Sequence, residues 1–111
     1  MEAKNLRVGN WVKLPQNQKP FQITVNNLHA ANTFRAITLS EYWLELLGFE
    51  KGQLWNVELW SNDMEHESYT MVHDLNEIHE NVNEVHQLQN LFFAITGEEL
   101  EIKDKSLLAD L

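Results

Sequence analysis

The stretch that decides the fold is EVHQLQNLFFAITGEEL, residues 84–100. At the 100° step of a helix, its apolar residues fall within a stripe of about 120°. These residues are Val85, Leu88, Leu91, Phe92 and Ile95. Asn81 with Glu84 three residues later is typical of a capping box, Asn83 is an alternative cap, and a glycine follows the last turn. The pattern predicts a helix over about residues 83–96 that buries its stripe against a sheet.

One aromatic side chain of this predicted helix lies off the stripe. Phe93 projects toward the side that carries His86, Gln89 and Asn90. An aromatic ring framed by amide and imidazole groups is typical of the centre of a protein-binding patch. We therefore expect these four residues to form a partner-binding anchor. The alternative is that a strand, or the C-terminal segment IKDKSLLADL, covers Phe93.

The rest of the chain predicts antiparallel strands and a second helix. The strand-like segments are LRVGNWVKL, FQITV, LHAANTFRAITL, QLWNVELW, SYTMVHDL and NEIHE. In SEYWLELLGFE, Ser40 as N-cap and Gly48 after the last turn predict a core helix over about residues 40–48. We expect an α+β fold, in which a curved or barrel-like antiparallel sheet of about five or six strands carries two helices. We expect a single domain over residues 1–101 and a C-terminal tail over residues 102–111.

The composition limits the chemistry. The chain has 111 residues and no cysteine, which excludes disulfides, thiolate zinc sites and cysteine nucleophiles. Its start lacks the apolar run of a signal peptide, and no stretch approaches the length of a membrane span. We therefore expect a cytoplasmic protein that does not associate with membranes.

Charge is distributed unevenly along the sequence. Residues 1–35 carry five basic residues and one acidic residue, whereas residues 36–101 carry fourteen acidic residues and Lys51 alone. Such a field repels nucleic acid and attracts basic partners. We expect an acidic face within residues 58–84 to bind a partner with a basic surface, and the alternative is a face that only keeps the protein soluble. The candidate acidic residues are Glu58, Glu65, Glu67, Glu77, Glu80 and Glu84.

Known catalytic and metal-binding patterns are missing. His66, His73, His79 and His86 follow one another at spacings of seven, six and seven, but these spacings define no third or fourth ligand. The two His-Glu pairs do not continue into a zinc-protease motif, and the chain has neither a glycine-rich phosphate loop nor a Gly-x-Ser-x-Gly elbow. We expect no metal, no cofactor and no catalytic residues, and hence a protein that is not an enzyme.

The basic N-terminal part suggests a second alternative. Trp11, Phe21, Phe34 and Arg35 are residue types that stack on bases in small sheet proteins that bind single strands. The net charge of −9 opposes this function, because neutralising phosphates supplies most of the non-specific affinity. We do not expect direct nucleic-acid binding.

Three segments together carry a resemblance. LRVGNWVKL, ITLSEYWLELLGFE and VHQLQNLFFAITGEELEI resemble a group of small, uncharacterised phage and prophage proteins from bacterial genomes. Small acidic proteins from mobile elements, anti-CRISPR proteins among them, frequently cover a nucleic-acid-binding surface of a host protein. The resemblance therefore implies a phage-encoded inhibitor of a host nucleic-acid-handling or defence protein, for example a CRISPR effector. The alternative is a structural or accessory phage protein that self-associates through Phe93 and Trp60.

Overall fold

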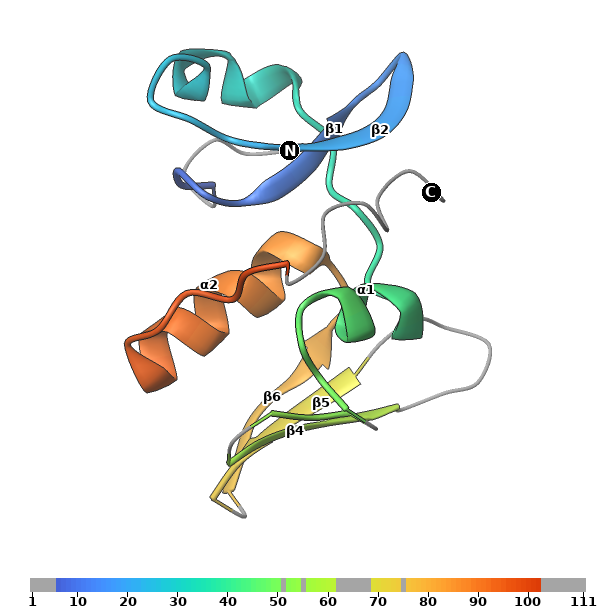
Figure 1. The fold of residues 1–111 in the computed structure, drawn as a ribbon, viewed down its shortest axis with the longest axis vertical. Coiled ribbons are helices and arrows are strands. Elements are labelled where there is room, and N and C mark those ends of the chain that lie inside the picture. Colours follow the sequence, from blue (N-terminus) through green and yellow to red (C-terminus); the bar gives the residue numbers. More distant parts are fainter. Residues whose placement is uncertain (1–5, 51, 55, 62–68, 75, 103–111) are drawn as a thin grey trace.

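The computed structural model describes residues 6–50, 52–54, 56–61, 69–74 and 76–102, without the side chains of residues 17, 18, 61, 79 and 80. They form a two-stranded sheet, a four-stranded sheet, two α-helices and a 3-10 helix (Figure 1). This confirms the α+β class and the antiparallel pairing. The expected curved or barrel-like sheet of about five or six strands corresponds to six antiparallel strands, which are divided between two sheets that do not close into a barrel.

The two-stranded sheet is a hairpin of β1 (Trp11–Leu14) and β2 (Asn17–Gln22). The chain enters β1 through Gly9, whose positive φ of 97° suits a glycine. β2 ends earlier than the alternation of FQITV predicts. Ile23 is buried, but Val25 is 78% exposed instead of sharing its face.

The expected third strand over LHAANTFRAITL is not formed. Residues Leu28–Thr33 make the 3-10 helix η2, because Ala and Asn favour strands poorly and Asn27 starts a turn with Thr24. An extended linker, residues 34–39, follows. It pairs with β1 through Lys13 and Arg35 and with the start of α2 through Thr38 and Glu84.

The second sheet has the order β3–β4–β5–β6. Its strands are β3 (Gln53–Leu54), β4 (Val57–Ser61), β5 (Tyr69–His73) and β6 (Asn76–Val82). QLWNVELW is thus not one strand, since Leu54 pairs with Val57 across a tight hairpin. Two register shifts between β5 and β6 add bulges to the edge strand.

Helix α1 (Glu41–Leu46) begins and ends as the sequence predicts. The Ser40 hydroxyl accepts a hydrogen bond from the Trp43 amide at 3.4 Å. Gly48 has a φ of 98°, and the amides of Gly48 and Phe49 bond back to Glu45 and Leu44, which is the Schellman pattern. Figure 1 shows α1 and α2 on the same face of the four-stranded sheet.

Helix α2 (Val85–Thr96) ends as expected at Gly97, with φ at 77°, but starts differently. Its N-cap is Glu84, whose side chain makes no capping bond, so the predicted capping box is wrong. Gln87 stabilises this end instead, because its amide group accepts from the Asn83 N–H and donates to the Asn81 carbonyl.

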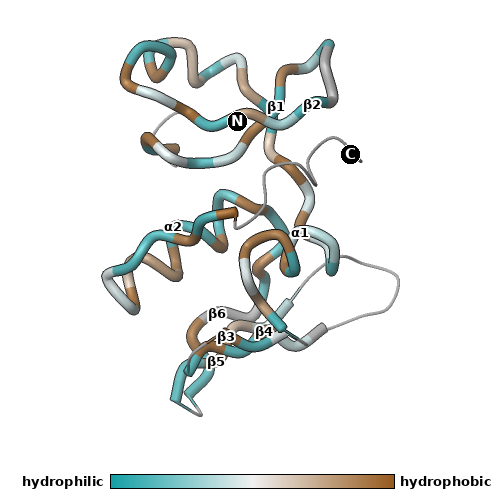
Figure 2. The backbone as a smooth tube through the Cα atoms, viewed as in Figure 1, coloured by the Kyte–Doolittle hydropathy of each residue, from teal (hydrophilic) through white to brown (hydrophobic). Residues whose placement is uncertain are grey.

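Two hydrophobic cores result. The hairpin core contains Leu6, Val12, Ile23, Ala31 and Phe34. The main core lies between the helices and the four-stranded sheet, where Phe49 and Phe92 meet edge to face at 6.1 Å. Leu100 and Ile102, beyond α2, are also buried in the main core. The hydropathy-coloured tube alternates along α2 and becomes hydrophilic at the turn between β5 and β6 (Figure 2).

Candidate protein-binding surface

The acidic residues that we expected to form one partner-binding face lie in different parts of the chain, and only some of them belong to the described part of the structure. Glu65 and Glu67, and the side chain of Glu80, lie outside the described part of the structure. Glu58 is half-buried on β4, Glu77 is exposed on β6, and Glu84 is the half-buried N-cap of α2.

On α2, the expected exposure of two residues is wrong. His86 is only 5% exposed and Gln89 is completely buried, so neither side chain is presented to a partner. Asn90 is half-buried and Phe93 is 43% exposed. The expected anchor therefore reduces to Phe93.

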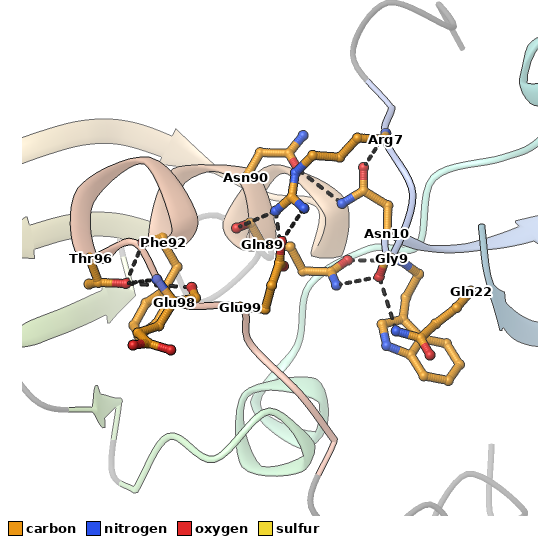
Figure 3. Close-up of polar contacts among 11 residues, drawn as sticks. Arg7, Gly9, Asn10, Gln22, Gln89, Asn90, Phe92, Thr96, Glu98 and Glu99 are labelled. Carbon is orange, nitrogen blue, oxygen red and sulfur yellow. Dashed lines mark hydrogen bonds and ion pairs between the residues drawn. The ribbon is translucent and has the colours of Figure 1, made fainter. Parts of the chain in front are cut away.

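Gln89 joins α2 to the N-terminal hairpin. Its Oε1 accepts a hydrogen bond from the Trp11 amide at 2.8 Å, and its Nε2 donates to the Gly9 carbonyl at 2.9 Å (Figure 3). A buried amide side chain with both ends bonded carries no desolvation penalty from an unpaired group. Gln89 therefore has a structural role that its position off the apolar stripe did not reveal.

The next residue extends the same contact. The Oδ1 of Asn90 accepts from Arg7 Nε at 2.7 Å and from Asn10 Nδ2 at 2.9 Å. Arg7 also forms an ion pair with Glu99, with an Nη2–Oε2 distance of 3.2 Å. We call Arg7, Asn10, Gln89, Asn90 and Glu99 the polar joint (Figure 3). The amide-rich segment HQLQN thus holds the two parts of the fold together.

Phe93 lies at the edge of the polar joint. The guanidinium carbon of Arg7 stands 4.9 Å from the centroid of its ring, a cation–π contact. The ring keeps 43% of its surface exposed. Phe93 is thus neither fully covered nor free on both faces, since its partner comes from the N-terminal segment.

His86 has an unusual electrostatic environment. Burial lowers the pKa of its imidazole below the usual value near 6.5, while the negative charge of Glu84 opposes part of that shift. Its Nδ1 is buried without a hydrogen-bond partner. Protonation of this ring is therefore unfavourable in the folded state.

The exposed aromatic side chain that sequence analysis placed only in an alternative is Trp60. The strand pairing puts Glu58 opposite Val72 and Trp60 opposite Thr70, on the outer face of the four-stranded sheet. No element among the described residues packs on this face, and the helices lie on the other (Figure 1). Trp60 is 60% exposed there, the highest exposure of any described aromatic side chain.

The orientation of Trp60 is fixed by its neighbour on the same face. The indole Nε1 donates to Glu58 Oε2 at 2.7 Å, so the polar tip is bonded while the ring faces outward. Glu77 on β6 pairs with Val72, and Ile78 at the adjacent bulge is 40% exposed. We call Glu58, Trp60, Thr70, Val72 and Glu77 the outer face.

The outer face has no cations from its own strands. The sequence contains no lysine or arginine between Lys51 and Lys103, so β3 to β6 and α2 contain neither, and the carboxylates of the four strands are those of Glu58, Glu77 and Glu80. Arg7, which reaches α2 from the N-terminal segment, is engaged by Glu99 and Asn90. A basic surface presented to the outer face would therefore meet carboxylates without competing basic neighbours from that sheet.

The N-terminal aromatic residues are placed differently from a base-stacking platform. Trp11 and Phe34 are 5% and 3% exposed, and Phe21 meets Phe34 edge to face at 5.0 Å. Trp11 packs into the main core against Trp43. These rings pack as core side chains, which removes the stacking surface that the nucleic-acid alternative requires.

The described residues offer neither a metal-binding cluster nor a membrane-spanning helix. No three His, Asp or Glu side chains among them are close enough to hold a metal ion together. None of the described helices combines the length and apolar character needed to cross a bilayer.

Comparison of the chain with protein-family models, with curated proteins and with solved structures found no match.

Proposed function

We propose that the protein is a non-enzymatic binding protein that covers a basic surface of a partner protein with the outer face. The observation that carries this proposal is Trp60, an indole ring held outward by Glu58 on an acidic sheet face. Tryptophan is the residue type most enriched at the energetic centres of interfaces. Because Glu58 already bonds its Nε1, the ring loses little conformational freedom on binding.

The acidic charge has a separate role in this proposal. Carboxylates around an aromatic anchor speed and orient the encounter with a basic partner, whereas the buried ring slows dissociation. The resemblance to small phage proteins suggests the partner class. On this basis the protein is a phage-encoded inhibitor, acting in the cytoplasm of the bacterial host on a nucleic-acid-handling or defence protein such as a CRISPR effector.

The test is capture from bacterial host lysate with matched variants. Trp60→Ala removes the proposed anchor, and Phe93→Ala removes an exposed aromatic ring elsewhere. We expect Trp60→Ala to weaken retention of a specific basic protein by about 30-fold or more, the factor that corresponds to a 2 kcal/mol hot spot. Loss of capture with Phe93→Ala alone would move the interface to α2 and contradict the proposal.

Charge is tested with a second matched pair. Glu77→Lys and Glu98→Lys change the net charge equally, but only Glu77 lies on the outer face. We expect Glu77→Lys to reduce capture and to restore nucleic-acid binding by the captured protein. Equal effects of the two variants would show that only the total charge matters.

Self-association through Trp60 is the competing function, since the same exposed ring favours it. Light scattering at several concentrations distinguishes the two. A dimer that dissociates on Trp60→Ala would favour the structural alternative, whereas a monomer at all concentrations is expected for an inhibitor that needs a partner.

A further inference from the structure

A groove lies between α1 and the inner face of the four-stranded sheet. It has a volume of about 390 Å³, within the range of sites that hold small ligands or single side chains. Leu44, Phe49 and Leu59 supply apolar lining, and Tyr69 and Gly52 line it from the sheet side. Gly52 fits closely, since a Cβ there would lie 2.7 Å from the Leu59 carbonyl oxygen.

Two carboxylates complete the lining. Glu41 and Glu45 belong to α1, one helical turn apart, and both are exposed. Residues at this spacing have neighbouring side chains on one side of a helix. Among the described residues, neither carboxylate forms an ion pair with a basic side chain. Within the described part of the structure, the groove therefore combines an apolar lining with a rim of two carboxylates that have no basic partner.

This combination matches one kind of occupant. Arginine and lysine side chains bury an apolar stem while they keep a charged end at a polar boundary. A cation at the rim would meet two carboxylates, and its stem would contact the apolar lining. A neutral apolar side chain would leave the carboxylates without a partner, and an anion would be repelled.

The groove lies at the same end of the sheet as Trp60. Leu59 and Tyr69 contribute to it from the inner face, while Trp60 lies next to Leu59 in β4 and points to the outer face. Tyr69 pairs with Ser61 and Thr70 pairs with Trp60. Trp60 and the groove thus lie at the same end of β4 and β5, on opposite faces of the sheet.

We propose that this groove is a socket for a basic side chain, arginine or lysine, of the partner protein. The inference rests on the proposed function, because it assigns the groove to the same partner. It adds a chemical requirement, namely a cation on an alkyl stem near the residue that contacts Trp60.

The socket is tested without the partner. N-acetyl-arginine amide is titrated into the full-length protein, and backbone amide signals are followed by two-dimensional NMR. We expect saturable shifts at Leu44, Gly52 and Leu59, with N-acetyl-lysine amide acting at the same signals. The citrulline analogue, which has nearly the shape of arginine but no charge, should not bind. Shifts that never saturate, or equal shifts with citrulline, would overturn the proposal.

Matched variants separate the rim from general charge. Glu41→Gln with Glu45→Gln, and Glu98→Gln with Glu101→Gln, each change the net charge from −9 to −7. We expect the α1 pair to weaken arginine binding at least about threefold, since an exposed ion pair contributes up to about fivefold. The control pair should leave binding unchanged, and equal weakening by both pairs would contradict the socket.

A third variant separates this inference from the proposed function. Trp60→Ala removes the outer-face anchor but leaves the groove lining intact, so arginine amide should bind it as it binds the unmodified protein. Failure of partner capture by Trp60→Ala tests the outer face, whereas failure of arginine binding in the unmodified protein overturns the socket alone.

Discussion

His86 shows how a single side chain makes the stability of this protein depend on pH. Its imidazole is buried at the first turn of α2, and its Nδ1 has no hydrogen-bond partner. Burial lowers its pKa in the folded state, despite the nearby charge of Glu84. The unfolded chain, with a histidine pKa near 6.5, binds a proton more readily than the folded chain.

As the pH falls below about 6.5, the unfolded state takes up a proton that the folded state resists, so the free energy of unfolding decreases until the folded pKa is passed. We expect the urea midpoint to fall between pH 7.5 and pH 5.5. His86→Gln should reduce this pH dependence, whatever its effect on stability at neutral pH. A His29→Gln control, at an exposed position, should keep the dependence.

The burial of Gln89 could not be predicted from the sequence, whereas that of its apolar neighbours on α2 could. The helical stripe predicted the burial of Val85, Leu88 and Phe92 correctly. It placed Gln89 on the polar side, because a buried amide is favourable only when its bonding partners are present. Those partners are backbone groups of Gly9 and Trp11, about 80 residues earlier in the chain. No local pattern in the sequence encodes that contact.

At the scale of elements, helix ends were easier to predict than strands. Ser40, Gly48 and Gly97 act as the sequence predicts, because caps depend on residues within a few positions of each other. The segment after Asn27 was mispredicted as a strand. Its residues alternate in places, but strand formation needs a neighbour to pair with, and the linker finds only single bridges to β1 and α2.

Gly97 gives a test of one such element. It ends α2 with a φ of 77°, and a Cβ there would meet no atom within 4 Å. Gly97→Ala should therefore destabilise the protein by about 1 kcal/mol through backbone strain and not through crowding. Chemical denaturation measures this difference. Gly97→Asn should cost less than Gly97→Ala, since asparagine tolerates left-handed conformations better, and an equal cost would contradict a backbone origin.

At the scale of the whole molecule, the described residues form two cores connected by β1, the linker and the polar joint. Neighbouring residues of β1 point to opposite faces, so Trp11 enters the main core and Val12 enters the hairpin core. Sequence analysis predicted the class, the antiparallel pairing and both α-helices. It did not predict two sheets, because that division depends on contacts between distant segments. For the same reason, sequence analysis proposed Phe93 as the binding anchor and named Trp60 only in an alternative. The exposure of Trp60 depends on which face of the sheet the helices cover, and the sequence does not give that.

Because the polar joint connects the two cores, we expect a substitution in it to favour local unfolding of the hairpin. Gln89→Leu keeps a similar side-chain volume but cannot bond the Trp11 amide or the Gly9 carbonyl. The Gly9 carbonyl keeps its bond from Gln22 Nε2 at 3.1 Å, so the main loss is the unpaired amide of buried Trp11. We expect a cost of about 1–3 kcal/mol.

Hydrogen exchange would show which part of the molecule Gln89→Leu destabilises. If the polar joint holds the hairpin to α2, the amides of β1 and β2 should exchange about 5- to 160-fold faster in Gln89→Leu, because the lost free energy lowers the cost of opening that part. Amides of β4 and β5, which pair within the four-stranded sheet, should change less. Gln53→Leu, at an exposed position of β3, is the matched control and should leave the hairpin amides unchanged. Uniform acceleration across both sheets would mean that the molecule opens as one cooperative unit, and that the polar joint contributes to its global stability without holding a separable part.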